Sequence, residues 1–174
     1  MPNFRHRLPR SQQKVYDRSN TIPAVPVRVS PRLARATTLL IGALESGEQP
    51  AIERLAQAIS DEICGALRVP VVRVLVRGTR PSDTRGELHG LYSPGLRQDK
   101  IEVWMITAKR GQVVAFKTFL RTLLHEICHH LDYELLHLSV SLHTDGFFKR
   151  ESSLFAQLTR AASQRPPEPV AEYA

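Results

Sequence analysis

Two stretches near the start of the folded part of the chain have their apolar residues three and four positions apart. They cover residues 31–47 and 49–69, and this spacing is typical of amphipathic helices. Each stretch has a proline near its start, and Gly47 and Pro70 follow their ends, as helix boundaries commonly do. The pattern therefore predicts two consecutive helices.

The following stretch has a different period. Residues 71–78 alternate apolar and polar side chains and are rich in β-branched residues, which is typical of a strand. Residues 87–93 and 100–108 are the next two expected strands, and 100–108 has Ile101, Val103 and Met105 on one face. Short connections between successive strands favour an antiparallel meander. The sequence therefore predicts a three-stranded, mostly antiparallel sheet.

Helical spacing returns after the predicted sheet. It runs over 113–138, breaks at 139–142, and resumes over 144–162. The order of elements predicts an α+β fold with N-terminal helices, a small sheet, one long helix and a C-terminal helix. Residues 31–162 are long enough to form one domain with its own core.

The two ends of the chain differ from this domain. Residues 1–30 are polar, basic and proline-containing, so we expect a disordered arm, and residues 163–174 are expected to form a flexible tail. The formal net charge of +7 lies entirely within residues 1–36, because the rest of the chain has equal numbers of acidic and basic residues. Such an arm suits contact with nucleic-acid phosphates, although a solvated tail without a partner has the same composition.

Composition also indicates a compartment. The chain has 2 cysteines, too few for a disulfide framework. Its first residues lack the apolar segment of a secretory signal, and it has no run of 18 apolar residues that would span a membrane. We therefore expect a cytoplasmic protein.

The long helix contains the candidate chemistry in the sequence LLHEICHH, residues 123–130. His125 and His129 are four residues apart, so both lie on one helix face and can bind one metal ion. Glu126 projects beside them, where a carboxylate can take a proton from a water bound to zinc. The apolar residues form a stripe on the opposite face, so the histidines are expected to face a cleft.

A catalytic zinc needs a third protein ligand. His143 follows the helix break, where the chain can fold back, and is the favoured choice. Asp132 and Glu134 could reach the metal only with distortion and are expected on a solvated face. His130 points about 100° away around the helix and His137 lies about 12 Å further along it, so both are expected outside the site.

Other side chains near the motif have weaker claims. Tyr133 continues the spacing of the two histidines and could donate a hydrogen bond to an oxyanion, and Tyr92 or His89 could approach from the strands. For each of them we favour a role as a partly buried packing residue. Cys128 and Cys64 are expected to be small buried residues.

From the H-E-x-x-H motif to the helix that follows His143, the chain resembles the SprT-like metalloproteases. His125, Glu126 and His129 match the family's H-E-x-x-H motif, His143 lies at a similar distance, and Phe147 follows four residues later. The resemblance covers about residues 50–160. The family's glycine after the third histidine is a threonine here, and no cysteine-pair zinc ribbon follows.

The resemblance implies a zincin-like, minigluzincin-like domain in which His125, His129 and His143 bind Zn²⁺ and Glu126 activates water. It implies a zinc metalloendopeptidase whose substrates are proteins or peptides. Because the family includes the Spartan proteases, which act on proteins crosslinked to DNA, it also suggests DNA-associated substrates. In related folds an edge strand binds the substrate backbone, and the strand at 100–108 is the expected one.

Three hypotheses therefore remain open. The first is a zinc metallopeptidase. The second is a nucleic-acid-associated protein whose zinc site is structural or inactive, with the basic residues 1–36 contacting the nucleic acid. The third is a helix whose histidines bind no metal.

Overall fold

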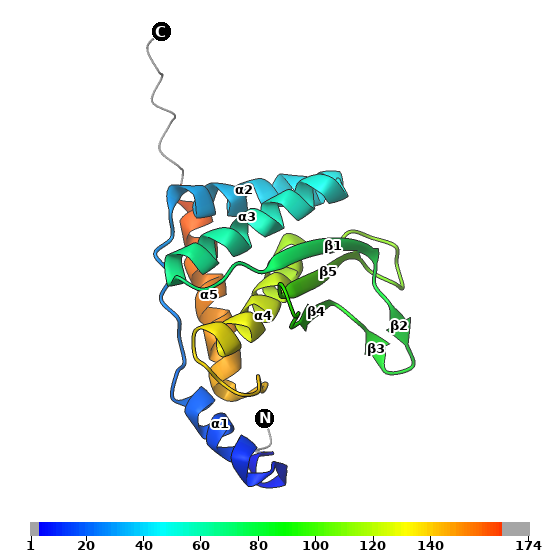
Figure 1. The fold of residues 1–174 in the computed structure, drawn as a ribbon. Helices are drawn as coiled ribbons and strands as arrows, with labels where there is room; N and C mark the ends of the chain where they lie inside the picture. The colour runs from blue at the N-terminus through cyan, green and yellow to red at the C-terminus, as the bar shows by residue number, and fades with distance from the viewer. Residues whose placement is uncertain (1–3, 165–174) are drawn as a thin grey trace.

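The computed structural model describes residues 4–164 and has the expected α+β composition (Figure 1). Its helices are η1 (Arg5–Arg7), α1 (Arg10–Asn20), α2 (Pro31–Ser46), α3 (Gln49–Leu67), α4 (Phe116–Glu134) and α5 (Asp145–Ser163). Its strands are β1 (Arg73–Thr79), β2 (Ser82–Asp83), β3 (Gly86–Glu87), β4 (Gly90–Ser93) and β5 (Lys100–Ile106). None of the described helices is both long enough and apolar enough to cross a bilayer.

The three-stranded sheet has the order β1-β5-β4, so it is not the expected meander. After β1 the chain forms the small antiparallel hairpin β2–β3 and then runs into β4, and β5 returns between β4 and β1. β5 is therefore antiparallel to β4 but parallel to β1. Two of the three strand pairings, counting the hairpin, are antiparallel.

This order also corrects the expected edge strand. β5 is the central strand, and both of its edges are paired. β4 is the edge strand beside α4, and its outer edge pairs with no other strand among residues 4–164.

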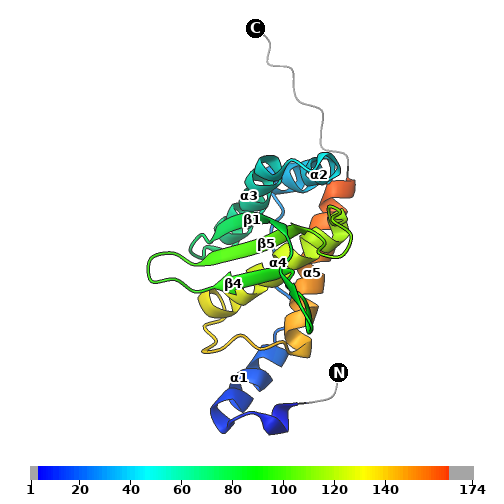
Figure 2. The ribbon, with the colours of Figure 1, turned by 90° about the vertical axis from the view of Figure 1, so that its right-hand side faces the viewer.

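One face of the sheet forms the core with the helices (Figure 2). Along β5, Ile101, Val103 and Met105 are buried, and the alternate residues are more exposed. α3 packs against β1, whereas α4 packs against β4 and β5. The register places Gly90 and Tyr92 of β4 beside Val103 and Ile101, so both face α4.

Residues 4–30 form η1, α1 and a packed connection to α2, whereas a disordered arm was expected for residues 1–30. α1 packs against α5 at the end of the molecule opposite α2 and α3 (Figure 1). The connection to α2 buries Val25 and Val27 in the core, and the Gln157 side chain hydrogen-bonds to the backbone of both. The predicted flexible tail at 163–174 lies almost entirely outside the described residues.

Candidate metal centre

The structure brings together the three histidines chosen as ligands. His125 and His129 lie on α4, and His143 lies in the loop before α5. The Nε2 atom of His143 is 3.0 Å from the Nε2 atom of His125 and 3.0 Å from that of His129. The three side chains are therefore close enough to hold one metal ion.

The second ring nitrogen of His125 is held by a carboxylate. Its Nδ1 atom lies 3.0 Å from Oε2 of Glu151 on α5. Because an ionised carboxylate only accepts hydrogen bonds, Nδ1 has to donate. The lone pair of neutral His125 is then on Nε2, which faces the other two histidines.

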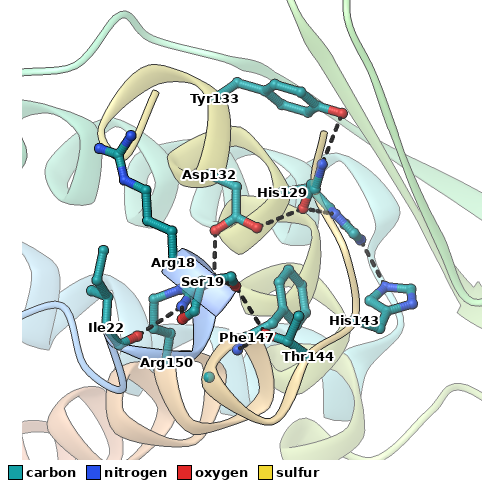
Figure 3. A network of polar contacts seen from close by, with 12 residues as sticks. Arg18, Ser19, Ile22, His129, Asp132, Tyr133, His143, Thr144, Phe147 and Arg150 are labelled. Atoms are coloured by element: carbon teal, nitrogen blue, oxygen red, sulfur yellow. Dashed lines mark hydrogen bonds and ion pairs between the residues drawn. The ribbon is translucent and has the colours of Figure 1, made fainter. Parts of the chain in front are cut away.

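His129 is oriented by a hydroxyl in the same way. Its Nδ1 atom lies 2.7 Å from Oγ of Ser141, and that hydroxyl donates to Oδ2 of Asp132 at 2.7 Å. A hydroxyl has one hydrogen, so Ser141 must accept from Nδ1–H of His129. The lone pair of His129 is again on Nε2. Figure 3 shows His129 between Asp132 and His143.

Burial favours the neutral form of His129 and His143. Desolvation, followed by the nearby His125 and His143, lowers the pKa of His129 to about 3. Desolvation, followed by His125, also lowers the pKa of His143. Neutral imidazoles are the form that binds metals, so the site is prepared for a cation at neutral pH.

The two distances to His143 suit a tetrahedral ion, and all three ligand nitrogens lie within 4.8 Å of one another. With Zn–N bonds of about 2.05 Å, tetrahedral angles place ligand nitrogens about 3.3 Å apart. The two nitrogen–nitrogen distances of 3.0 Å to His143 need to change by only a few tenths of an ångström. Three histidine nitrogens, with the tautomers of His125 and His129 fixed by Glu151 and Ser141, match the ligand set of catalytic zinc sites, which keep a fourth position open.

Glu126 lies beside these ligands and is only 6% exposed. Burial raises the pKa of its carboxyl to about 7, against smaller lowering effects from His125 and a hydrogen bond to the Tyr92 backbone. Glu126 and His125 line a cavity of about 360 Å³ between α4, α5 and β4. The carboxylate therefore reaches a space where a substrate could bind.

β4 can lie close to Glu126 because residue 90 is a glycine. A Cβ atom on Gly90 would be 2.6 Å from Oε1 of Glu126 and 2.8 Å from Cγ2 of Thr122. The edge strand thus forms one wall of the same cavity as the candidate base. His89 also lines this cavity.

The two tyrosines lie near the site, but their hydroxyls have other partners. The Tyr92 ring stacks on His129 with centroids 6.4 Å apart, and its hydroxyl donates to Asp99 at 2.5 Å. The Tyr133 hydroxyl accepts from the backbone N–H of Ser141 at 3.3 Å. The Tyr92 contact supports a packing role, because its hydrogen is already donated to Asp99, whereas the Tyr133 hydroxyl keeps its own hydrogen for another acceptor.

His130 lies outside the metal site but is not a surface residue. It is 1% exposed, with Nδ1 at 3.2 Å from Asp99 and Nε2 at 2.8 Å from the Pro70 carbonyl oxygen. It therefore joins α4 to the segments before β1 and β5. His137 is exposed and outside the site, as expected, but it follows the end of α4 instead of lying on the helix.

The expectation that Asp132 covers a solvated face is wrong. Asp132 is fully buried and pairs with Arg150, which is 1% exposed, at 2.8 Å. Glu151, Ser141 and this ion pair are the supporting residues that the sequence did not reveal. No local pattern marks them, because Ser141 and Glu151 lie 12 and 26 residues from the histidines that they orient.

The chain was compared with protein-family models, with curated proteins and with solved structures, and none of them matches.

Proposed function

We propose that this protein is a zinc-dependent metalloendopeptidase of the SprT-like type. The observation that supports this most directly is the convergence of three histidine Nε2 atoms beside the buried Glu126. The resemblance in sequence at residues 125–147 points in the same direction, and zinc is the proposed metal because its catalytic sites use this ligand set.

A zinc ion at this centre would act as a Lewis acid and lower the pKa of a water molecule to near neutrality. Glu126 would accept that proton on its carboxylate and later deliver it to the nitrogen of the leaving amine. Burial raises the pKa of this carboxyl to about 7 in the metal-free protein, and a bound cation would lower that pKa and favour the ionised form that accepts the proton.

The proposed substrate is an extended segment of a protein or peptide. The outer edge of β4 presents backbone N–H and C=O groups beside the cavity, and an extended chain can pair with such an edge as an added strand. This would place a substrate peptide bond between β4 and the three histidines.

The first test is zinc content together with hydrolysis of an unfolded protein substrate. We expect the purified chain to bind one equivalent of zinc, His143→Ala to lose most of it, and Glu126→Gln to keep zinc while losing hydrolysis. His6→Ala, in the exposed N-terminal segment, is the matched control and should change neither. Full zinc content in His143→Ala would remove that ligand, and hydrolysis by Glu126→Gln would remove the base.

A second candidate function is nucleic-acid binding, and the surface of α1 favours it. Arg10, Lys14 and Arg18 are exposed and four residues apart, so they form one basic face of the helix. Such a face can neutralise phosphates without reading sequence. It would act alone if the zinc site is structural or inactive, or would bring the peptidase to DNA-associated proteins.

The test is the salt dependence of binding to duplex DNA. Replacing the three basic residues with glutamine should reduce the slope of log affinity against log salt by about 0.9 for each phosphate that is no longer neutralised. Lys109→Gln/Arg110→Gln, in the exposed turn after β5, is the control. Equal slopes for both variants would exclude α1 as the binding surface.

We propose the cytoplasm as the compartment, since both cysteines are free thiols.

A further inference from the structure

We propose that the docking of α1 positions the metal ligand His129 through Arg150, Asp132 and Ser141. The inference rests on the proposed metal binding and extends it to a helix more than 100 residues away in sequence. Its central observation is an unbroken series of polar contacts between the C-terminal end of α1 and Nδ1 of His129 (Figure 3).

Arg150 connects α1 to Asp132 in this series. Its Nη2 atom donates to Oδ1 of Asp132 at 2.8 Å and to Oγ of Ser19 at 3.0 Å. Its Nη1 atom donates to the carbonyl oxygens of Ser19 at 2.8 Å and Ile22 at 2.7 Å. Three of the four oxygen atoms that accept hydrogen bonds from Arg150 therefore belong to the end of α1 and the turn after it.

The environment makes Arg150 dependent on these partners. Arg150 is 1% exposed, Asp132 is fully buried, and Nε of Arg150 has no hydrogen-bond partner among residues 4–164. A desolvated guanidinium that loses its partners moves toward water or toward another acceptor. Release of α1 would therefore move Arg150 and free the Asp132 carboxylate that holds Ser141.

A change at Asp132 reaches the metal ligand directly. Ser141 accepts from His129 only while its own hydrogen is directed to Asp132. Without that acceptor the hydroxyl can rotate and donate to Nδ1, and this would favour the tautomer with hydrogen on Nε2. That tautomer cannot bind a metal through Nε2. The carboxylate thus fixes both the ring orientation and the tautomer of His129.

α1 also contacts the residues that flank His143. Oγ of Ser19 lies 2.8 Å from Oγ1 of Thr144, which caps α5 by accepting from the Phe147 backbone N–H. The Asn20 side chain accepts from the backbone N–H of Gly146 at 2.8 Å. A Cβ atom on Gly146 would be 2.2 Å from the Ser19 carbonyl oxygen, so the absence of a side chain is what permits this contact.

Thermodynamic linkage makes the effect reciprocal. If docked α1 favours metal binding, bound metal must favour docked α1 by the same factor. Residues that support metal ligands typically contribute 10- to 100-fold in metal affinity. We expect a coupling of about tenfold, since α1 acts on His129 through three intervening side chains.

The first measurement uses the unmodified chain. Amide hydrogen exchange at residues 10–22 should slow about tenfold when Zn²⁺ saturates the site, compared with the same protein in chelator. Exchange in β1, which takes no part in this series, provides the reference within the molecule. Unchanged exchange at residues 10–22 on zinc saturation would overturn the proposal.

The second measurement uses two substitutions with matched controls. Gly146→Ala inserts a methyl group between α5 and α1. Ser19→Ala removes the Ser19 hydroxyl that contacts Arg150 and Thr144. Gly65→Ala adds a methyl group to α3 where nothing lies within 4 Å, and Ser11→Ala changes an exposed position of α1. We expect the first pair to weaken Zn²⁺ binding about tenfold, and the controls to leave it unchanged.

Replacing Zn²⁺ with Co²⁺ allows the visible absorption spectrum of the bound metal to be measured, and a loss of protein stability alone would not change the positions of its bands. The visible absorption bands of tetrahedral Co²⁺ should shift in Ser19→Ala, because the orientation of His129 changes. Wild-type affinity and spectrum in both Gly146→Ala and Ser19→Ala would overturn the inference while leaving the peptidase proposal intact. A wild-type chain that binds no zinc would instead overturn the proposed function itself.

Discussion

The two ring nitrogens of His125 and of His129 have different partners, and this arrangement leaves Nε2 of both residues available to a metal ion. Nδ1 faces Glu151 in one case and Ser141 in the other, and both Nε2 atoms face His143. A histidine that merely packs, such as His130, has protein acceptors for both nitrogens. The partner of each nitrogen thus separates the two kinds of residue.

Glu126 gives a prediction about stability and pH in the metal-free protein. Burial raises its pKa from 4.5 to about 7, so the folded state favours the protonated carboxyl. The stabilisation from this proton is complete below pH 4.5 and is lost as the pH rises through 7. At pH 8 the buried charge therefore costs on the order of 3 kcal/mol.

Glu126→Gln should remove that cost. In chelator, we expect its free energy of unfolding in urea to exceed that of the wild type by roughly 2–3 kcal/mol at pH 8, with little difference at about pH 4.5. The pH dependence of this difference isolates Glu126 from the other titrating groups. An equal difference at both pH values would contradict the raised pKa.

At the scale of elements, the site depends on how closely β4 lies against α4. Gly90→Ala would bring a methyl group within 2.6 Å of the Glu126 carboxylate, so the strand or the carboxylate must move. We expect hydrolysis to fall at least tenfold, because misplacement by about 1 Å can cost 100-fold, while zinc content is kept. Gly78→Ala on β1 has open space and should retain activity. Equal activity in the two variants would show that β4 does not set the position of Glu126.

α4 is also fixed to the sheet by a buried histidine. His130→Leu would leave the Pro70 carbonyl and the Asp99 carboxylate without this partner, at a cost of roughly 2–4 kcal/mol. Urea unfolding measures this loss, and His6→Leu at an exposed position is the control. A loss below about 0.5 kcal/mol, the usual range for surface substitutions, would contradict the structural role.

Local periodicity predicted most elements but not how they are arranged. The helices α2 to α5 and the strands β1, β4 and β5 lie close to their expected positions, because spacing along the chain reports which face is buried. The sheet order was not predictable, since β1 pairs with β5 only after an intervening hairpin. α1 was missed because its few apolar residues resemble those of a disordered tail, and the partners of its buried Ser19, Thr144 and Arg150, are distant in sequence.

In the candidate site, too, local spacing predicted some residues, and contacts between distant segments determined the others. His125, Glu126 and His129 share one turn of α4, so their spacing alone placed them together. His143 was found from the break before it. Asp132 was misplaced because its partner Arg150 lies 18 residues away on another helix, and no sequence spacing reveals such a pair.

For the whole molecule, metal binding should appear as stability. Free Zn²⁺ at about 100 times its dissociation constant should raise the free energy of unfolding by about 2.7 kcal/mol, provided that the unfolded chain does not bind it. Urea unfolding with zinc and with chelator measures the difference. His143→Ala should lose most of this increment, and an equal increment in both proteins would place the metal elsewhere.

The contact between α1 and α5 has a consequence for the order of folding. Ser19 and Thr144 are 125 residues apart in sequence, and contacts of such separation form late because the intervening chain must first be closed into a loop. On a ribosome α1 emerges early but has to wait for α5, which is synthesised last of the described helices. A complete candidate metal centre therefore forms only after α5 has been synthesised, and a nascent chain without α5 lacks the Glu151 carboxylate that orients His125.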